Sequence, residues 1–324
     1  MTSTTYTRED FSNNVEIRWC PGCGDYAILL ALQRLLPELG LAPEQHVFVS
    51  GIGCAGRLPY YMNAYGFHTI HGRAPAVATG LKSMRDDLTV WLITGDGDAL
   101  SIGGNHLIHC LRRNVNINIL LFNNQVYGLT KGQFSPTSKK GQVTKTSPQG
   151  VTNEPINPLM LALAAGASFV ARAVDKDPVY LAQVLKQAYE HPGCSFVEIY
   201  QDCNIFNNGA FDEFALKTNR ADKTVILEEG KPLLFGNEKQ WALVQEDDAL
   251  RSVAYQEEGT PYLHAPDNFM AAMRLARASY PDLPVPLGVY YQQVRDIYTF
   301  KNPIEKTTVD VDALFRSRAS WQQE

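Results

Sequence analysis

Short apolar runs alternate with longer helical segments along most of the chain. The runs are rich in β-branched and aromatic side chains, which favours buried strands, and they cover residues 47–50, 67–70, 90–93, 117–122, 169–174 and 196–200. The predicted helices cover residues 25–36, ending before Pro37, then 159–165 and 179–189, with two more opening at 71–75 and 101–105. Strands separated by helices predict an α/β fold with a doubly wound parallel sheet.

Polar residues follow two of these strands, at the strand ends where open parallel sheets bind ligands. Gly95-Asp96-Gly97 follows the run 90–93, and Asn124 follows the run 117–122. Asp96, the amide of Asn124 and the backbone carbonyl of Val126 offer hard oxygen ligands, which suit Mg²⁺ that also holds a diphosphate. Gly95 and Gly97 carry no side chain, so backbone N–H groups can approach a phosphate. A lone GDG is an ordinary turn, but GDG, a helix and then Asn-Asn predict this site.

The six cysteines carry a second candidate chemistry. Cys20 and Cys23 lie in WCPGCG, Cys54 follows the strand 47–50, and Cys203 follows the strand 196–200. In a chain of this length outside an oxidising compartment, such cysteines indicate a metal or catalysis rather than disulfides. By itself the CxxC pair fits a redox motif, half of a zinc site or half of a cluster site. Cys110 and Cys194 fall in a helical run and at a strand start, so we expect structural roles for them.

Composition and charge exclude several function classes. The 324 residues carry a net charge of −5, which gives no electrostatic case for binding nucleic acid or an anionic membrane. No apolar run approaches the roughly 20 residues that span a bilayer. The first 14 residues are polar and include acidic side chains, unlike a signal or transit peptide, so we expect a cytoplasmic protein.

The motifs together resemble those of a known family. WCPGCG, GIGCAGR, HGRAPAVATGLK, GDGDALSIGGNH, FNNQVYGLTKGQ and QDC are similar to segments of the β subunit of 2-oxoacid:ferredoxin oxidoreductases, over roughly residues 15 to 210. The overall resemblance is greatest to the 2-oxoglutarate enzymes (2-oxoglutarate synthase). It implies bound thiamine diphosphate, Mg²⁺ and one [4Fe–4S] cluster held by Cys20, Cys23, Cys54 and Cys203. Coenzyme A is then a co-substrate and ferredoxin the electron partner.

The resemblance also implies roles for individual residues. Ile52, Gly53 and Cys54 are expected at the cofactor on one side, and Leu129 and Thr130 on another. For His71 the resemblance suggests a hydrogen bond to the diphosphate, and a helix cap or core histidine fits equally well.

Asn105 has the same two readings, a contact with the cofactor or a polar role within its helix. Arg57 and Lys131 are expected to bind substrate carboxylates, against the plainer reading of both as solvated surface cations. Two cations suit a dicarboxylate, which favours 2-oxoglutarate over pyruvate or a broad range of 2-oxoacids.

Three regions are predicted along the chain. Residues 1–14 form an N-terminal arm, residues 15–208 the domain that binds thiamine diphosphate and [4Fe–4S], and residues 209–324 a smaller region that covers the cluster and contacts a partner. The polar stretch 135–158 has no helical or strand period and starts beside the site, so we expect a lid or selectivity loop there.

A second domain for the aminopyrimidine ring is missing from this pattern. We therefore expect an α subunit that carries it, in a dimer of αβ heterodimers. Two rival classes remain at this point: a non-redox thiamine-diphosphate carboligase or decarboxylase, which the four cysteines disfavour, and an iron–sulfur carrier subunit in which the GDG…NN unit is only structural.

Overall fold

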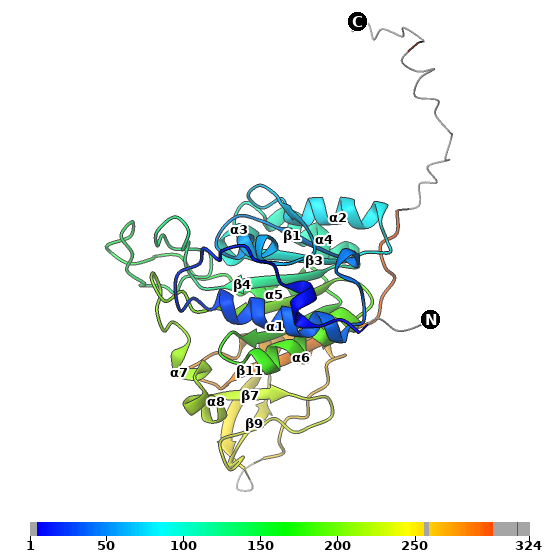
Figure 1. Ribbon diagram of the computed structural model, residues 1–324. Helices are drawn as coiled ribbons and strands as arrows, with labels where there is room; N and C mark the ends of the chain where they lie inside the picture. Colours follow the sequence, from blue (N-terminus) through cyan, green and yellow to red (C-terminus); the bar gives the residue numbers. More distant parts are fainter. Residues whose placement is uncertain (1–4, 256–258, 301–315, 317–324) are drawn as a thin grey trace, which may run out of the picture.

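The structure is a computed structural model that describes residues 5–255, 259–300 and 316. The start of the predicted N-terminal arm (residues 1–4) and parts of the predicted C-terminal region (256–258, 301–315 and 317–324) lie outside the described residues. A large sheet runs through the centre with helices on both faces, and a smaller sheet lies below it (Figure 1).

The large sheet has eight strands. In spatial order they are β2 (Tyr65–His68), β1 (His46–Ser50), β3 (Thr89–Gly95), β4 (Asn118–Asn123), β6 (Ser195–Tyr200), β5 (Phe169–Val174), β11 (Val285–Gln292) and β7 (Thr224–Leu227). Neighbouring strands are parallel except for β11, which runs antiparallel to β5. The predicted doubly wound α/β sheet is therefore confirmed as a mainly parallel one.

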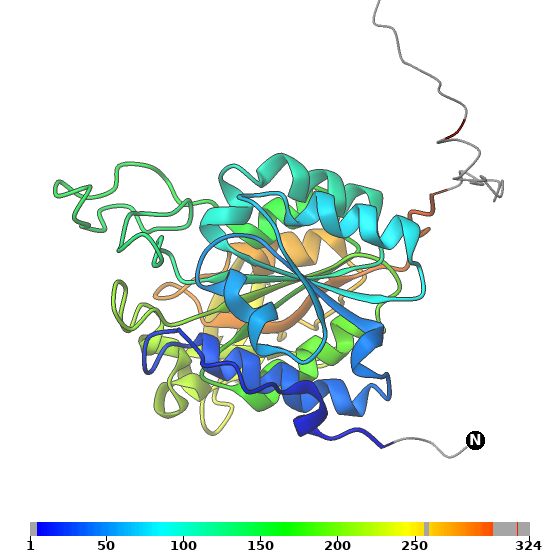
Figure 2. The ribbon, with the colours of Figure 1, turned by 45° about the horizontal axis from the view of Figure 1, so that its top comes forward.

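Side chains of the central strands alternate between two apolar cores. Val47 and Val49 point into the core beneath one helical layer, and Phe48 points into the core beneath the other. Because both faces are covered, these strands read as continuous apolar runs. Figure 2 shows the two helical layers on either side of the sheet.

The helices divide between the two faces. One layer is built from α2 (Ala74–Met84), α4 (Gly104–Arg113), α5 (Pro158–Ala164) and α9 (Phe269–Arg277), and the other from α1 (Asp25–Glu38) and α6 (Pro178–Glu190). Shorter helices are α3 (Asp96–Leu100), α7 (Asp212–Ala215), α8 (Lys217–Lys223), and the 3₁₀ turns η1 (Arg8–Phe11), η2 (Pro43–Gln45) and η3 (Ala55–Tyr61).

Three local predictions need correction. The first helix does not end before Pro37 but runs to Glu38; the proline lacks one backbone N–H, and because only one further residue follows it the helix is not broken in its interior. The strand expected at 67–70 is β2, two residues earlier, an exposed edge strand whose register is set by pairing Val47 with Tyr65. The helix expected from 101–105 is preceded by α3, which begins at Asp96 directly after β3.

The described residues after 208 belong partly to the large sheet and partly to a second, smaller sheet. Strands β7 and β11 complete the large sheet, while β8 (Leu234–Phe235), β9 (Trp241–Glu246) and β10 (Ala249–Ala254) form a small antiparallel sheet. The large sheet therefore crosses the predicted division after residue 208, since apolar strands from both sides of it share one core, and the division into regions of different role stays a prediction.

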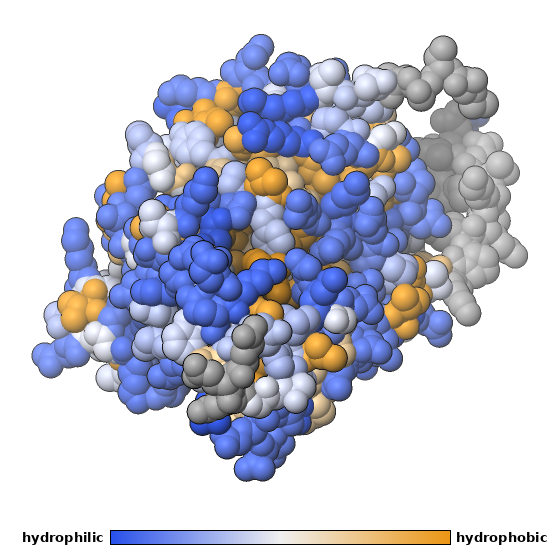
Figure 3. Space-filling model, turned by 90° about the horizontal axis from the view of Figure 1, so that it is seen from below, coloured by the Kyte–Doolittle hydropathy of each residue, from blue (hydrophilic) through white to orange (hydrophobic). Residues whose placement is uncertain are grey.

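The described residues contain no candidate for a membrane-spanning helix. No helix there is both long enough and apolar enough to cross a bilayer. Seen from below, the surface is mainly hydrophilic and is interrupted by small apolar patches (Figure 3).

Candidate active site

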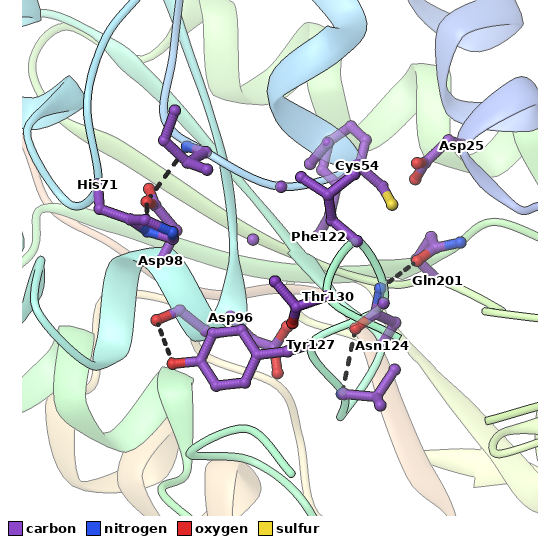
Figure 4. Close-up of a pocket in the computed structure, with 18 residues that line it drawn as sticks. Asp25, Cys54, His71, Asp96, Asp98, Phe122, Asn124, Tyr127, Thr130 and Gln201 are labelled. Carbon is purple, nitrogen blue, oxygen red and sulfur yellow. Dashed lines mark hydrogen bonds and ion pairs between the residues drawn. The ribbon is translucent and has the colours of Figure 1, made fainter. Parts of the chain in front are cut away.

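A cavity opens at the carboxyl ends of four neighbouring parallel strands, β1, β3, β4 and β6. Figure 4 shows side chains from all four strand ends turned toward it. Because parallel strands end at the same edge of the sheet, segments far apart in sequence meet there. The residues that line it are Asp25, Ile52, Gly53, Cys54, Ala55, His71, Gly95, Asp96, Gly97, Asp98, Phe122, Asn124, Val126, Tyr127, Gly128, Leu129, Thr130 and Gln201.

Asp96 is the first residue of α3 and is buried at the floor of the cavity. Its Oδ2 accepts hydrogen bonds from the hydroxyl of Ser135 at 2.5 Å and that of Thr137 at 2.6 Å. Burial raises the pKa of the Asp96 carboxyl to about 6, and the two hydroxyl donors oppose that rise. A carboxylate held in this way is oriented before any metal binds.

A chain of buried polar groups supports Asp96 from behind. The Thr137 hydroxyl also lies 2.9 Å from Oδ1 of Asn123, whose Nδ2 donates to Glu198 at 2.7 Å. Glu198 in turn forms a buried ion pair with Arg172 at 2.7 Å. Every member has a partner, which keeps a buried polar network from being costly. The first asparagine of the Asn-Asn pair therefore holds the scaffold, and the second faces the cavity.

Asn124 reaches the cavity from the end of β4. Its Oδ1 accepts from the backbone N–H of Val126 at 3.2 Å, and its Nδ2 donates to Gln201 at 2.8 Å. Val126 lines the same cavity. Asp96, Asn124 and Val126 thus offer carboxylate, amide and carbonyl oxygens around one space, a donor set that fits Mg²⁺.

Asp98 was not predicted as a site residue, although it lies within the GDGD motif. Its buried Oδ1 accepts from the backbone N–H groups of Ile52 at 3.2 Å and Gly72 at 2.9 Å, and lies 2.9 Å from Nδ1 of His71. Thr94 donates to its Oδ2 at 2.8 Å. Asp98 therefore fastens two cofactor loops to β3.

The contact with Asp98 also fixes the tautomer of His71. A carboxylate only accepts hydrogen bonds, so Nδ1 carries a proton and donates it to Asp98, which leaves Nε2 as the ring nitrogen available to another partner. The predicted contact of His71 with the diphosphate stays a prediction, and its place on the cavity wall is compatible with it.

Gly97 has no room for a side chain. A Cβ added there would lie 2.2 Å from the ring of Tyr127, whose hydroxyl donates to the carbonyl of Gly97 at 3.0 Å. The tyrosine thereby packs the loop after β4 against the start of α3.

The cysteine loops meet at the other end of the cavity. A Cβ added to Gly128 would lie 3.4 Å from the sulfur of Cys203 and 3.8 Å from that of Cys54, so both sulfurs face one point. Cys23 lies close enough that charge on these two cysteines raises the pKa of its thiol, although burial is the largest cause. Cys20 is exposed beside them, and its carbonyl accepts from the N–H of Cys23 at 3.1 Å.

Asp25 makes this end chemically unusual. It is fully buried on the cavity wall, and neither carboxyl oxygen has a hydrogen-bond partner among the described residues. Burial raises the pKa of Asp25 to about 7, and burial followed by the charge of Asp25 raises that of Cys54 to about 12. The charge of Arg57 opposes the rise at Cys54, and iron would add positive charge to this set of buried acids.

The described side chains at the cysteine end do not form a site for a single metal ion. Within the described ranges, no group of three or more His, Cys, Asp or Glu side chains could hold a single metal ion. In a [4Fe–4S] cluster each thiolate binds a different iron, so the ligands stand further apart. Cys110 and Cys194 lie in the apolar core beneath α4, where Cys194 is fully buried, in agreement with structural roles.

Besides Cys20, Cys23 and Cys203, three predicted site residues lie outside the cavity lining. Asn105 is exposed on α4, and its predicted contact with the cofactor stays a prediction. Arg57 lines a neighbouring hollow with Arg18, Tyr60 and His68. Lys131 is exposed on the rim with a left-handed backbone, φ 78°.

The loop predicted as a lid has a buried beginning. Ser135, Thr137 and Ser138 are all buried, and Ser138 donates to the carbonyl of Gln125 at 2.6 Å. The first residues of the stretch 135–158 therefore hold Asp96 and the loop after β4 in place, through the hydroxyl groups in which this stretch is rich.

Comparison with known proteins agrees with the fold. Residues 51–199 match the family described as thiamine pyrophosphate enzyme, C-terminal TPP binding domain. The fold is similar to that of a chain of 2-oxoglutarate:ferredoxin oxidoreductase from Magnetococcus marinus, solved with 2-oxoglutarate, coenzyme A and succinyl-CoA bound. That likeness covers 98% of both chains, with a TM-score of 0.75 and 32% sequence identity.

Two relatives carry the sequence comparison. The chain is 58% identical over 238 residues to the 2-oxoglutarate oxidoreductase subunit KorB of Mycobacterium tuberculosis, covering 73% of this chain and 63% of that subunit. It is 37% identical over 224 residues to the 2-oxoglutarate synthase subunit KorB of Methanocaldococcus jannaschii, covering 69% of this chain and 80% of that subunit. The first match thus spans less than two thirds of the relative.

Fold, strand-end motif and family match together define a thiamine diphosphate-binding domain of the α/β type. The chain belongs to the β subunits of the 2-oxoacid:ferredoxin oxidoreductases, as its motifs predicted.

Proposed function

We propose that this chain is the β subunit of a 2-oxoglutarate:ferredoxin oxidoreductase, which converts 2-oxoglutarate and coenzyme A to succinyl-CoA and CO₂, or runs the reverse reaction. One observation carries the proposal: a single cavity joins the GDGD and Asn-Asn strand ends to Cys54 and to the glycine that faces Cys203. The names of the relatives and the ligands of the Magnetococcus marinus enzyme support 2-oxoglutarate as the substrate.

The residues of the cavity fit the two implied groups. Asp96, Asn124 and the carbonyl of Val126 would hold Mg²⁺, and the backbone around Gly97 would receive the diphosphate. Bound thiamine diphosphate supplies the electron sink that lets the carboxyl carbon of a 2-oxoacid leave as CO₂. Cys20, Cys23, Cys54 and Cys203 would hold the [4Fe–4S] cluster, which takes electrons one at a time toward ferredoxin.

The chain's own groups set the conditions for this chemistry. The hydroxyls of Ser135 and Thr137 keep Asp96 aimed, and Asp98 keeps the proton of His71 on Nδ1. Ile52, Leu129 and Phe122 give the space between the two ends an apolar lining.

The remaining half of the site belongs to a partner. We assign the aminopyrimidine domain to an α subunit in a dimer of αβ heterodimers, so the chain alone is expected to be catalytically silent. Arg57 and Lys131 are proposed to bind substrate carboxylates in the assembled enzyme, since neither lines the cavity of this chain by itself. We also propose that the assembled enzyme is cytoplasmic.

The test is turnover by the chain copurified with its α subunit. We expect reduction of ferredoxin that depends on coenzyme A, with a higher kcat/KM for 2-oxoglutarate than for pyruvate, and no turnover by the single chain reconstituted with thiamine diphosphate. Losing a charge-assisted hydrogen bond costs about 1.5–3 kcal/mol, so Arg57→Ala and Lys131→Ala should each lower the preference about ten- to a hundred-fold.

Two results would contradict this assignment. Preference for pyruvate in the wild type would move the substrate to another 2-oxoacid. A colourless, iron-free preparation that still decarboxylates would favour a non-redox carboligase or decarboxylase instead.

A further inference from the structure

Gln201 occupies a position between the two ends of the cavity. It is the first residue after β6 and lies two residues before Cys203. Its side chain is 1% exposed, and its backbone N–H donates to the carbonyl of Asn123 at 3.0 Å. The residue is thus anchored to the end of β4, beside Asn124, while it borders the cysteine loops.

Both ends of the Gln201 amide are in use. Oε1 accepts from Nδ2 of Asn124 at 2.8 Å, and Nε2 donates to the sulfur of Cys23 at 3.2 Å and to the carbonyl of Asp202 at 2.6 Å. A backbone carbonyl only accepts hydrogen bonds, so the NH₂ group must face Asp202 and Cys23. The amide orientation therefore follows from its partners (Figure 4 shows its bond to Asn124).

The same reasoning fixes Asn124. The backbone N–H of Val126 only donates, so Oδ1 of Asn124 must face it and Nδ2 must face Gln201. Hydrogen bonds then run in one direction from Val126 through Asn124 and Gln201 to the Cys23 sulfur.

Each bond has a separate chemical consequence. The acceptor on Gln201 holds the Asn124 amide with its oxygen toward the N–H of Val126, which lines the same cavity, and partners of this kind tune metal affinity. The donor on Gln201 stabilises negative charge on the Cys23 thiolate, and hydrogen bonds to cluster sulfurs set the reduction potential. A donor favours the reduced cluster, because reduction adds negative charge.

We propose that Gln201 is a positioning residue that couples the magnesium–diphosphate site to the iron–sulfur cluster, orienting Asn124 with its carbonyl and raising the reduction potential of the cluster with its N–H. The inference rests on the proposed function, since it takes Asn124 and Cys23 as ligands of those two groups. It concerns only how one amide serves both.

The test uses the αβ complex with Gln201→Met, which keeps the side-chain length and removes both hydrogen bonds. Two quantities are measured: the midpoint potential of the cluster by EPR-monitored redox titration, and the affinity for thiamine diphosphate in the presence of Mg²⁺ by calorimetry. We expect the potential to become more negative, by roughly tenfold in the reduction equilibrium constant or about 59 mV. The affinity should weaken about tenfold, with full iron content.

Gln33→Met is the matched control, because Gln33 is also a buried glutamine whose amide donates to a backbone carbonyl, that of Tyr61 at 3.3 Å. It should move neither quantity. Gln201→Leu repeats the test with a branched side chain in case the first variant loads its cluster poorly.

The proposal is overturned if the Gln201 variants match the Gln33→Met control, or if only one of the two quantities moves. It is equally overturned if both Gln201 variants lose the cluster while Gln33→Met keeps it, since Gln201 would then build the site rather than tune it. Absence of iron or thiamine diphosphate from the wild-type complex is a different result, and contradicts the proposed function instead.

Discussion

The two ends of the cavity treat their buried acids in opposite ways. At the diphosphate end, Asp96 has two hydroxyl donors and Asp98 has donors from two loops and from β3. At the cysteine end, both oxygens of Asp25 lack a hydrogen-bond partner among the described residues, and burial raises the pKa of the neighbouring Cys54 thiol to about 12. The chain therefore orients the acids of the diphosphate end with its own donors, whereas the carboxyl of Asp25 has no such donor among the described residues.

The difference follows from the elements that carry each end. The diphosphate end stands on strand ends locked by the register of β3 and β4, where Gly95 pairs with Phe122. The cysteine end is assembled from loops before α1, after β1 and after β6, and Cys20 is exposed. We infer that the chain preorganises the diphosphate end more fully than the cysteine end.

The largest effect is expected from removing single thiols. Replacing Cys20, Cys23, Cys54 or Cys203 with alanine should abolish the cluster. Each thiolate would bind one iron, and the loops that carry these cysteines are not held in place by strands once the cluster is lost. Iron content and the broad visible absorbance measure this. Cys110→Ala and Cys194→Ala are the matched controls; loss of iron in either, with retention at one of the four, would break the assignment.

Asp96→Ala should separate the two ends. Loss of an outer partner of a metal ligand alone costs about 10–100-fold in affinity, so loss of the ligand itself should weaken thiamine diphosphate binding with Mg²⁺ by more than about 100-fold. Iron content should stay at the wild-type level. Asp87→Ala, at an exposed aspartate paired with Arg85, is the control. Tight cofactor binding by the Asp96 variant would show that the motif was misread.

Thr137→Val tests preorganisation directly. The substitution keeps the shape of the side chain and removes the hydroxyl that lies between Asp96 and Asn123. We expect affinity for Mg²⁺ with thiamine diphosphate to fall about tenfold, at the lower end for such partners, without loss of iron. Thr79→Val, which removes a hydroxyl bonded within α2, is the control. Equal affinities in the two variants would mean that Asp96 needs no support.

The smallest effect is expected at Asp98. Asn at this position keeps an oxygen for the N–H groups of Ile52 and Gly72, and its amide can donate to Thr94, so only the charge is lost. Neutral hydrogen bonds are weaker than charge-assisted ones, which should cost roughly 1–2 kcal/mol in the free energy of unfolding. Chemical denaturation measures it. Cofactor affinity should change only a few-fold; a loss as large as that of Asp96→Ala would make Asp98 a ligand rather than a fastener.

The sequence determined the alternation of strands and helices and the residues at the strand ends. A strand buried on both faces has to be a continuous apolar run, and the glycines and oxygen ligands of the diphosphate motif follow the strand directly. For that reason the predicted residues Gly95, Asp96, Gly97 and Asn124 all line one cavity in the structure.

Only the tertiary structure decided which polar side chains support the site. Ser135, Thr137 and Gln201 are ordinary polar residues in the sequence, and each acquires its role from a partner that lies 39, 41 or 77 positions away. The shared sheet of β7, β11 and β5 was likewise hidden, because its pairing joins segments from both sides of residue 208. The local pattern of apolar and polar residues indicates whether a segment is a helix or a strand. Contacts between distant segments depend on how these elements pack, and a short window of sequence does not contain that information.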